Sequence, residues 1–273
     1  MPELPEVETT RRGIAPHIVS HKVTSVTVRN PSLRWPIPGD LADTLKNQSV
    51  HSVSRRSKYL LLKCDTGTLI IHLGMSGHLQ IIEDGSLVGK HDHVDIQFDH
   101  GMTLRYTDPR RFGAVLWSDG SDIYSHPLLA KLGPEPLSDE FSLDYFMRVA
   151  SGRRVTIKTF VMNGNYVVGV GNIYANESLF LAGIHPKTPA GSLSKKQYEK
   201  LLLVIKQVLD KAIAAGGTTL KDFKKSDGKP GYFAQQLNVY GRESEACRVC
   251  ATEIVQYKEA QRATYYCPQC QVL

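Results

Sequence analysis

The sequence predicts an α+β protein in three consecutive parts: a sheet-rich half, a helical segment and a small cysteine module. Short apolar or alternating runs bounded by turn residues fill the first 132 residues, a helical period follows, and four of the five cysteines lie in the last 27 residues. With 273 residues, 41% of them hydrophobic, the chain can bury a core in about two domains. We expect an N-terminal sheet domain, a linker, a helical domain and a cysteine module at 1–132, 133–150, 151–236 and 237–273.

The first half should begin with a helix and continue as an antiparallel sheet structure. The helix is expected to start at Pro2 or Pro5, because proline suits the first helical turn, and to stop before Pro16. Residues 99–101, Asp-His-Gly, separate two apolar runs and predict a hairpin. The expected strands are 22–28, 59–63, 69–73, 94–98, 102–106 and 114–117.

The second half has helical periodicity. Ser194 and Gln197 have the spacing of a capping box ahead of an apolar stripe that ends before Gly216 and Gly217. A second helix is expected over 172–182, closed by a glycine. Residues 218–236 are polar and lysine-rich, which predicts a long functional loop. The stripe consists of Leu201, Val204, Ile205, Val208 and Ala212.

Charge and targeting signals restrict the class of protein. Lysine and arginine exceed aspartate and glutamate by 33 to 27, and the pI is near 9.0, so the balance permits a polyanionic partner without requiring one. The start lacks a basic region followed by an apolar one, and no apolar run approaches the roughly 18 residues of a membrane span. We therefore expect a soluble, cytoplasmic protein with no membrane attachment.

The last cysteines predict a zinc ribbon. Cys247 and Cys250 form one Cys-x2-Cys knuckle, Cys267 and Cys270 form another, and sixteen residues separate the two knuckles. Runs at 253–258 and 263–266 should be strands joined by a tip at 259–262, from which Arg262 projects. Acidic and basic residues are balanced in this module, so its composition leaves DNA contact by the tip open.

The N-terminus combines an amine with a carboxylate. Removal of Met1 would expose the secondary amine of Pro2, and an α-amino group titrates near about 8, lower at the positive end of a helix. Such an amine can form an iminium with a sugar C1′, with Glu3 as the acid or base. From the pattern alone, a proline in a first helical turn is the commoner explanation.

Long motifs along the whole chain resemble the bacterial formamidopyrimidine-DNA glycosylase family. They occur in the order of that family and end in the four-cysteine ribbon. Residues 162–165, MNGN, depart from the family pattern, in which an LLDQ-like run is common. The matching motifs are PELPEVET at 2–9, KHDH at 90–93, TDPRRFG at 107–113, GVGNIYANESLF at 169–180 and GGTTLKDF at 216–223.

The resemblance implies an N-terminal β-sandwich with a leading helix and a C-terminal helix-two-turn-helix region with a zinc ribbon, with DNA in the cleft between. It also implies roles. Pro2 matches the Schiff-base nucleophile, and Glu3 matches the carboxylate that assists sugar opening and base loss. Lys58 matches a lysine for phosphate contact and β-elimination, and Arg262 matches the ribbon arginine for phosphate contact and δ-elimination.

Further residues match DNA contacts of the family. Base excision from a duplex requires the base to be flipped out and the gap filled. Two apolar wedges, Met75 and Phe112, and one guanidinium, Arg110, match the gap-filling residues. Residues 218–232 match a loop over the flipped purine, with Lys221 among its contacts. Phosphate contacts are implied for His91, Arg110, Arg153, Lys158 and Asn172.

The implied function is a bifunctional glycosylase and AP lyase for 8-oxoguanine and formamidopyrimidines in base excision repair. It would act as a monomer on damaged double-stranded DNA, with one structural zinc ion and no catalytic metal or organic cofactor. The sister enzyme of the endonuclease VIII type, which prefers oxidised pyrimidines, is the nearest alternative. A non-catalytic zinc-ribbon DNA-binding protein is an alternative from another class, and Pro2 followed by Glu3 argues against it.

Overall fold

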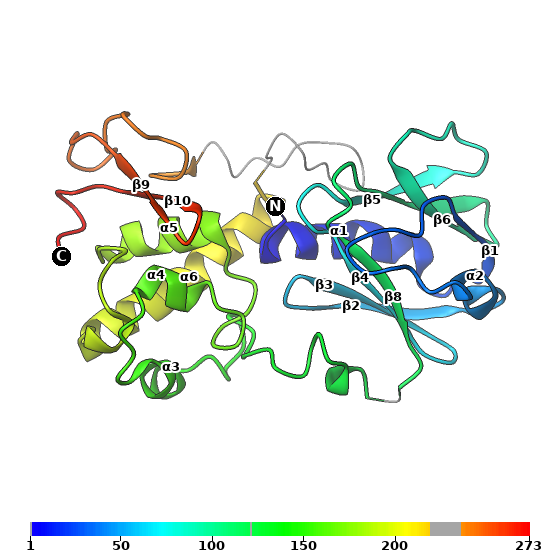
Figure 1. Cartoon of the computed structure of the whole chain (residues 1–273), viewed down its shortest axis with the longest axis horizontal. Coiled ribbons are helices and arrows are strands. Elements are labelled where there is room, and N and C mark those ends of the chain that lie inside the picture. Colours follow the sequence, from blue (N-terminus) through cyan, green and yellow to red (C-terminus); the bar gives the residue numbers. More distant parts are fainter. Residues whose placement is uncertain (1, 121, 219–235) are drawn as a thin grey trace. The chain divides into compact units, whose positions relative to one another are not determined.

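The computed structural model describes residues 2–120, 122–218 and 236–273 (Figure 1). The described residues form two compact units. The first contains the chain up to Ala130 together with 215–218, and the second contains 131–214 together with 236–273. No helix in the described part of the chain is both long and apolar enough to span a membrane.

The first unit contains two four-stranded antiparallel sheets (Figure 1). Apolar side chains from the strands of both sheets belong to a single buried core, which identifies a β-sandwich. One sheet has the order β1 (Val23–Val28), β6 (Asp92–Phe98), β7 (Met102–Thr107), β5 (His78–Glu83), and the other has the order β2 (Val50–Arg56), β3 (Tyr59–Cys64), β4 (Thr68–His72), β8 (Ala114–Ser118). The unit also contains α1 (Leu4–Ile18), α2 (Leu41–Leu45) and the 3-10 turn η1 (Ile123–Ser125).

The leading helix is confirmed, but its expected end is wrong. Helix α1 passes through Pro16 and ends at Ile18. Pro16 lacks an N–H for the Arg12 carbonyl, yet both residues lie on the exposed side, where water can satisfy that carbonyl. Ile14 and Ile18 are fully buried, so packing of the last turn outweighs the lost hydrogen bond.

The six expected strands and the hairpin at 99–101 are confirmed, with Gly101 in the left-handed region at φ +80°. Strands β2 and β5 were not predicted. Strand β2 reads VHSVSRR with only Val50 and Val53 buried, so its alternation is weak. It is held by pairing with β3, a contact that the local sequence does not encode.

The second unit is helical and carries the cysteine hairpin. The expected helices are confirmed: Gln197 and Ser194 exchange the two capping-box bonds, and Gly183 closes the other helix at φ +71°. Two shorter helices, α3 and α4, were not predicted. The elements are α3 (Leu143–Ala150), α4 (Ile157–Val161), α5 (Asn172–Ala182), η2 (Ala190–Ser192), α6 (Lys195–Ala214), β9 (Val255–Glu259) and β10 (Arg262–Tyr266).

A buried carboxylate on α5 holds the segment that leads into the cysteine module. Glu177 is 2% exposed and accepts four N–H groups. Its Oε2 accepts the backbone and side-chain N–H of Asn238 at 2.8 and 3.0 Å, and its Oε1 accepts the backbone N–H groups of Val239 and Tyr240 at 2.9 Å each. Strand β10 packs beside the same helix (Figure 1). The module is therefore anchored on α5 at two places.

Candidate functional site

The N-terminal end of α1 carries the first candidate residues. Pro2 is buried, Glu3 is 2% exposed, and both directly precede the helix. The carboxylate of Glu6 accepts the N–H of Glu3 at 2.8 Å and the N–H of Thr218 at 2.8 Å. Gly217 has φ +80°, a left-handed conformation that favours glycine, and a Cβ there would also lie 3.1 Å from the same carboxylate. Glu6, for which the sequence predicted no role in the site, thus joins the helix start to Thr218.

A second acidic residue of α1 fixes the turn that carries Lys58. Arg55 donates from Nε to Glu8 at 3.3 Å and from Nη1 to the carbonyl of Ser57 at 2.8 Å. Ser57 adopts φ +56° in the two-residue turn between β2 and β3, directly before Lys58. The Glu8 carboxylate therefore ties this turn to α1.

The charge on Glu8 should make stability depend on pH. Burial raises its pKa, but hydrogen bonds from Arg11 and Arg12 outweigh that effect and lower the pKa from 4.5 to about 2. A depressed pKa means that the stabilisation, on the order of 3 kcal/mol, is present above pH 4.5 and disappears as pH falls toward 2. We predict that Glu8→Gln lowers the free energy of unfolding in urea by about that amount at pH 6. The difference in unfolding free energy between Glu8→Gln and the unmodified protein should become smaller below pH 4.5. A difference that does not change with pH would contradict the prediction.

The side chain of His72 lies beside the Lys58 turn. Its Nδ1 accepts the N–H of Gly74 at 3.0 Å, and its ring lies 4.8 Å from the ring of Tyr59. Burial and the nearby charge of Lys58 lower the pKa of His72 to about 4. The imidazole is therefore neutral at physiological pH, and it supports the turn that carries Met75.

Two turns of the first unit meet around a buried carboxylate, Asp108, which is fully inaccessible. Its Oδ1 accepts the hydroxyl of Ser76 at 2.7 Å and the N–H of Arg110 at 3.3 Å. Its Oδ2 accepts the hydroxyl of Tyr106 at 3.1 Å and the N–H of Gly113 at 2.9 Å. One side chain thus fixes both the turn at 73–77 and the turn at 108–113.

These turns present the three predicted gap-filling side chains on the surface of the first unit. The Phe112 ring is 44% exposed and lies 4.9 Å from the guanidinium carbon of Arg110, while Met75 is half-buried. Gly74 has φ +62°, and a Cβ there would lie 2.4 Å from the backbone of Phe112. Only glycine permits so close an approach, which brings Met75 beside Phe112.

Neighbouring residues complete this surface. The carbonyl of His91 accepts the N–H of Asp108 at 3.0 Å, and the half-buried His91 side chain lies at the edge of the turn. Arg34, an exposed residue not identified from the sequence, donates its backbone N–H to Gly113 at 3.2 Å. It stands alone in a loop, so no sequence pattern pointed to it. The exposed residues Arg34 and Arg110 thus make this surface basic around the hydrophobic side chains of Met75 and Phe112.

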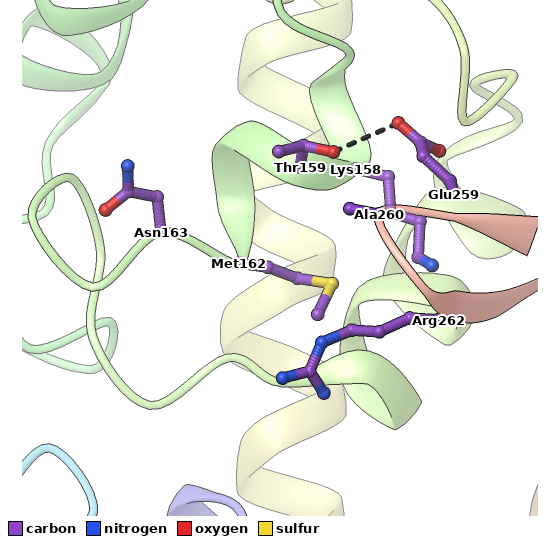
Figure 2. A pocket seen from close by; sticks show the side chains of 7 residues that line it. All are labelled: Lys158, Thr159, Met162, Asn163, Glu259, Ala260 and Arg262. Atoms are coloured by element: carbon purple, nitrogen blue, oxygen red, sulfur yellow. Dashed lines mark hydrogen bonds between the residues drawn. The ribbon is translucent and has the colours of Figure 1, made fainter.

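The second unit contains a pocket between α4 and the tip of the β9–β10 hairpin (Figure 2). Lys158 is 2% exposed, and its ammonium donates to Thr264 Oγ1 at 2.6 Å and to the Ala263 carbonyl at 3.3 Å. Arg262 is exposed, and Figure 2 shows its guanidinium extended past Met162. The pocket has a volume of about 250 Å³ and is lined by Lys158, Thr159, Met162, Asn163, Glu259, Ala260 and Arg262.

The hairpin tip is a two-residue turn. Ala260 and Gln261 have φ of +46° and +62°, the pair of left-handed residues that a type I′ turn requires. The strands thus reach Glu259 and Arg262, slightly farther than predicted. Glu259 accepts the hydroxyl of Thr159 at 3.0 Å (Figure 2), which fastens the tip to α4.

Two other predicted phosphate ligands have different surroundings. Asn172, the first residue of α5, donates its side-chain amide to the Ala263 carbonyl at 2.9 Å, as Lys158 does, and so lies beside the pocket. Arg153 donates to the Val149 carbonyl at 2.6 Å and stacks at 4.4 Å on Tyr166. It is outside the residues that line the pocket.

The four cysteines of the ribbon fit a zinc ion. Their sulfur atoms all lie within 4.8 Å of one another. The Sγ atoms of Cys250 and Cys267 are 3.4 Å apart, and those of Cys247 and Cys270 are 3.9 Å apart. A tetrahedral ion with Zn–S bonds of about 2.3 Å needs sulfur atoms about 3.8 Å apart. The thiolates would hold one structural Zn²⁺, and the bound ion would stabilise the fold of a segment that is too small to fold alone.

Family models cover most of the chain. Residues 1–115 match the formamidopyrimidine-DNA glycosylase N-terminal domain, residues 132–224 match the H2TH domain of the same glycosylase, and residues 244–272 match the zinc finger found in FPG and IleRS. The chain belongs to the formamidopyrimidine-DNA glycosylase family. The predicted fold class, a β-sandwich followed by a helix-two-turn-helix region and a four-cysteine zinc module, is confirmed.

Individual relatives agree over their full length. The formamidopyrimidine-DNA glycosylases of Thioalkalivibrio sulfidiphilus and Pseudomonas entomophila are each 56% identical over 271 residues, 99% of this chain and 100% of theirs. The Lactococcus lactis Fpg bound to DNA with an abasic site has 33% identity and a TM-score of 0.92, covering 99% of this chain and 100% of that one. The Thermus thermophilus MutM protein has 34% identity and a TM-score of 0.89, covering 99% and 98%.

Within this glycosylase, the predicted site residues fall into two groups. The first unit holds seven of them, on or beside the start of α1, the β2–β3 turn and the two turns fixed by Asp108: Pro2, Glu3, Lys58, Met75, His91, Arg110 and Phe112. Lys158, Asn172 and Arg262 surround the hairpin pocket of the second unit. Lys221 and almost all of the predicted loop at 218–232 lie outside the described residues.

Proposed function

We propose that this family member removes oxidised purines, 8-oxoguanine and formamidopyrimidines, from duplex DNA and then cleaves the strand at the abasic site. The supporting observation is the position of Pro2 and Glu3, both buried directly before α1 in a chain of this family. Once Met1 is removed, the Pro2 nitrogen can attack C1′ of the damaged nucleotide. The C1′–N bond to the base breaks, and the base leaves with a proton. The C1′–O4′ bond then opens, O4′ takes up a proton with the help of Glu3, and the C1′–Pro2 adduct becomes a covalent iminium.

Strand cleavage follows from that iminium. Its positive charge acidifies C2′–H; loss of this proton expels the 3′ phosphate, and a second elimination expels the 5′ phosphate. Glu3 assists ring opening and base loss, Lys58 transfers a proton in the first elimination, and Arg262 contacts phosphate in the second. The product is a one-nucleotide gap with phosphate at both ends. Water then hydrolyses the C1′=N bond, which releases the sugar fragment as an aldehyde and regenerates the Pro2 amine.

Lesion access requires the base to leave the stack. Met75 and Phe112 would occupy the gap while Arg110 bonds the orphaned cytosine, and His91, Lys158 and Asn172 would contact phosphates. Arg153 is a weaker candidate, because its guanidinium already has partners in its own unit. A single chain supplies these groups, so the enzyme acts as a monomer, in the bacterial cytoplasm with the nucleoid.

Borohydride trapping against a panel of lesions tests this proposal. An adduct on the N-terminal peptide with 8-oxoguanine opposite cytosine is the expected result. A Lactococcus lactis Fpg has been crystallised with DNA that contains an oxidised pyrimidine, so thymine glycol belongs in the panel. Trapping with thymine glycol but not with 8-oxoguanine would favour specificity of the endonuclease VIII type. The absence of an adduct with every lesion would favour the remaining alternative, a non-catalytic zinc-ribbon protein that binds DNA.

The buried carboxylate between the wedge turns gives a second test. In Asp108→Asn, an amide N–H₂ faces hydroxyl and N–H donors, and each group left unsatisfied costs about 1 to 3 kcal/mol. We predict a KM for the 8-oxoguanine duplex at least about tenfold higher, because Met75 and Phe112 lose their fixed positions. The adduct should still form at saturating DNA.

The control for this test is Asp119→Asn, which alters an exposed carboxylate of the same unit. It should leave both KM and kcat unchanged. If Asp108→Asn behaved like the control while retaining its fold, the carboxylate would have no part in positioning the wedge.

A further inference from the structure

We propose that His21, Asp99 and His100 form a surface site for a divalent transition-metal ion, separate from the zinc ribbon and from the turns that carry the wedge residues. One ligand atom from each of the three side chains lies within 4.8 Å of the other two. The Nδ1 atoms of His21 and His100 lie 3.0 and 3.7 Å from Asp99 Oδ1. The two imidazole rings stack with their centroids 3.6 Å apart.

The backbone around these residues is well fixed. Asp99 and His100 occupy the turn between β6 and β7, which is closed by a hydrogen bond of 3.2 Å from Gly101 N–H to the Phe98 carbonyl. The N–H of Asp99 donates to the Lys22 carbonyl at 2.9 Å, next to His21. Strands β1 and β6 pair beside this point (Figure 1). The three side chains therefore start from positions that folding has already brought together.

The distances suit metal coordination after small side-chain rotations. Tetrahedral zinc with bonds of about 2.0 to 2.1 Å places its nitrogen and oxygen ligands about 3.3 Å apart. The two nitrogen-to-oxygen distances of this cluster, 3.0 and 3.7 Å, fall on either side of that value. Two imidazoles and one carboxylate suit Zn²⁺, Ni²⁺ or Cu²⁺ rather than Mg²⁺ or Ca²⁺, which prefer oxygen ligands. The side chains are 28% to 45% exposed, so water can complete the coordination.

A second histidine–aspartate pair distinguishes this cluster from a simple ion pair. His51 Nε2 lies 2.6 Å from Asp65 Oδ1 on the surface of the same unit. Across the described parts of the chain, this pair belongs to no group of three metal-ligating side chains. Binding of a divalent transition-metal ion is strengthened by a third ligand. The His51–Asp65 pair is therefore a matched control, with the same kinds of side chain but no third ligand.

Metal binding here would link two segments that are far apart in the chain. His21 and Asp99 are 78 residues apart in sequence, and an ion that holds them joins the start of β1 to the β6–β7 turn. A ligand that binds only the folded state stabilises it by mass action. The expected consequence is stabilisation of the first unit by the ion, without participation in excision.

The test uses the untagged, full-length, zinc-loaded protein, titrated with NiCl₂ at pH 7.5 in a calorimeter. We expect one saturable Ni²⁺ site per chain, while the zinc content measured in the same sample stays at one ion. His21→Gln and His100→Gln should each weaken Ni²⁺ binding by more than about tenfold, since loss of even an outer-sphere partner costs roughly 10- to 100-fold. His51→Gln should bind Ni²⁺ as the unmodified protein does.

A parallel readout is thermal unfolding, in which Ni²⁺ should raise Tm in the unmodified protein and in His51→Gln but not in His100→Gln. Three results would overturn the site: no saturable Ni²⁺ binding, binding accompanied by equivalent loss of zinc, or binding that neither His21→Gln nor His100→Gln weakens.

Discussion

A short peptide extension before Pro2 will abolish the borohydride-stable adduct between this glycosylase and DNA containing 8-oxoguanine. The extension converts the Pro2 nitrogen into an amide, whose lone pair is delocalised into the carbonyl and cannot attack C1′. Pro2 lies in a buried position directly before α1, and Glu3 is equally buried, so added residues will also disturb the surroundings of the carboxylate. We expect less than one hundredth of the normal adduct.

Two controls separate loss of the amine from general damage. The same peptide placed after Leu273 should leave trapping intact, because the C-terminal residue is exposed. Glu3→Gln keeps the amine and removes the acid–base group, so we expect base excision about 10² to 10⁴-fold slower. Undiminished trapping by the extended protein, with the adduct mapped away from the N-terminus, would assign the nucleophile to another side chain.

Features encoded by neighbouring residues were predictable from the sequence. The capping box of Ser194 and Gln197, the left-handed glycine that ends α5 and the paired cysteine knuckles each depend on spacings of two to four residues. Each also restricts the backbone by its own chemistry, whatever the rest of the chain does. The zinc module and the two main helices could therefore be placed without a structure.

Features that depend on distant partners were missed. Strand β2 exists because β3 pairs with it, and α1 continues past Pro16 because Ile18 is buried by the sheets. Glu6 is one of several acidic residues in the first turns of the helix, and only the fold brings Thr218 to it. Asp108 shows the same limit: within its motif it resembles a turn residue, although the buried hydroxyl of Ser76 is its partner.

A large loss of stability is expected from Glu177→Gln. The carboxylate accepts four N–H groups, two at each oxygen, from Asn238, Val239 and Tyr240. Replacing either oxygen by N–H₂ leaves two donors without an acceptor and adds a third buried donor. At about 1 to 3 kcal/mol for each of these three groups, we expect a loss of at least about 3 kcal/mol. That loss is concentrated where the cysteine module joins α5.

Zinc retention and DNA affinity measure the consequence. In Glu177→Gln, the module should release zinc to a chelator at least about a hundredfold faster, since 3 kcal/mol corresponds to roughly two powers of ten. DNA binding should weaken along with it, because Arg262 is carried by the same hairpin. The matched control is Glu245→Gln, whose carboxylate is 58% exposed and pairs with Arg242; that change should cost no more than about 1 kcal/mol. Equal zinc release from the two variants would mean that Glu177 does not hold the module. The module would then be stabilised by its zinc ligands and by the buried cluster of Cys247, Ile254 and Cys267, without an anchor on α5.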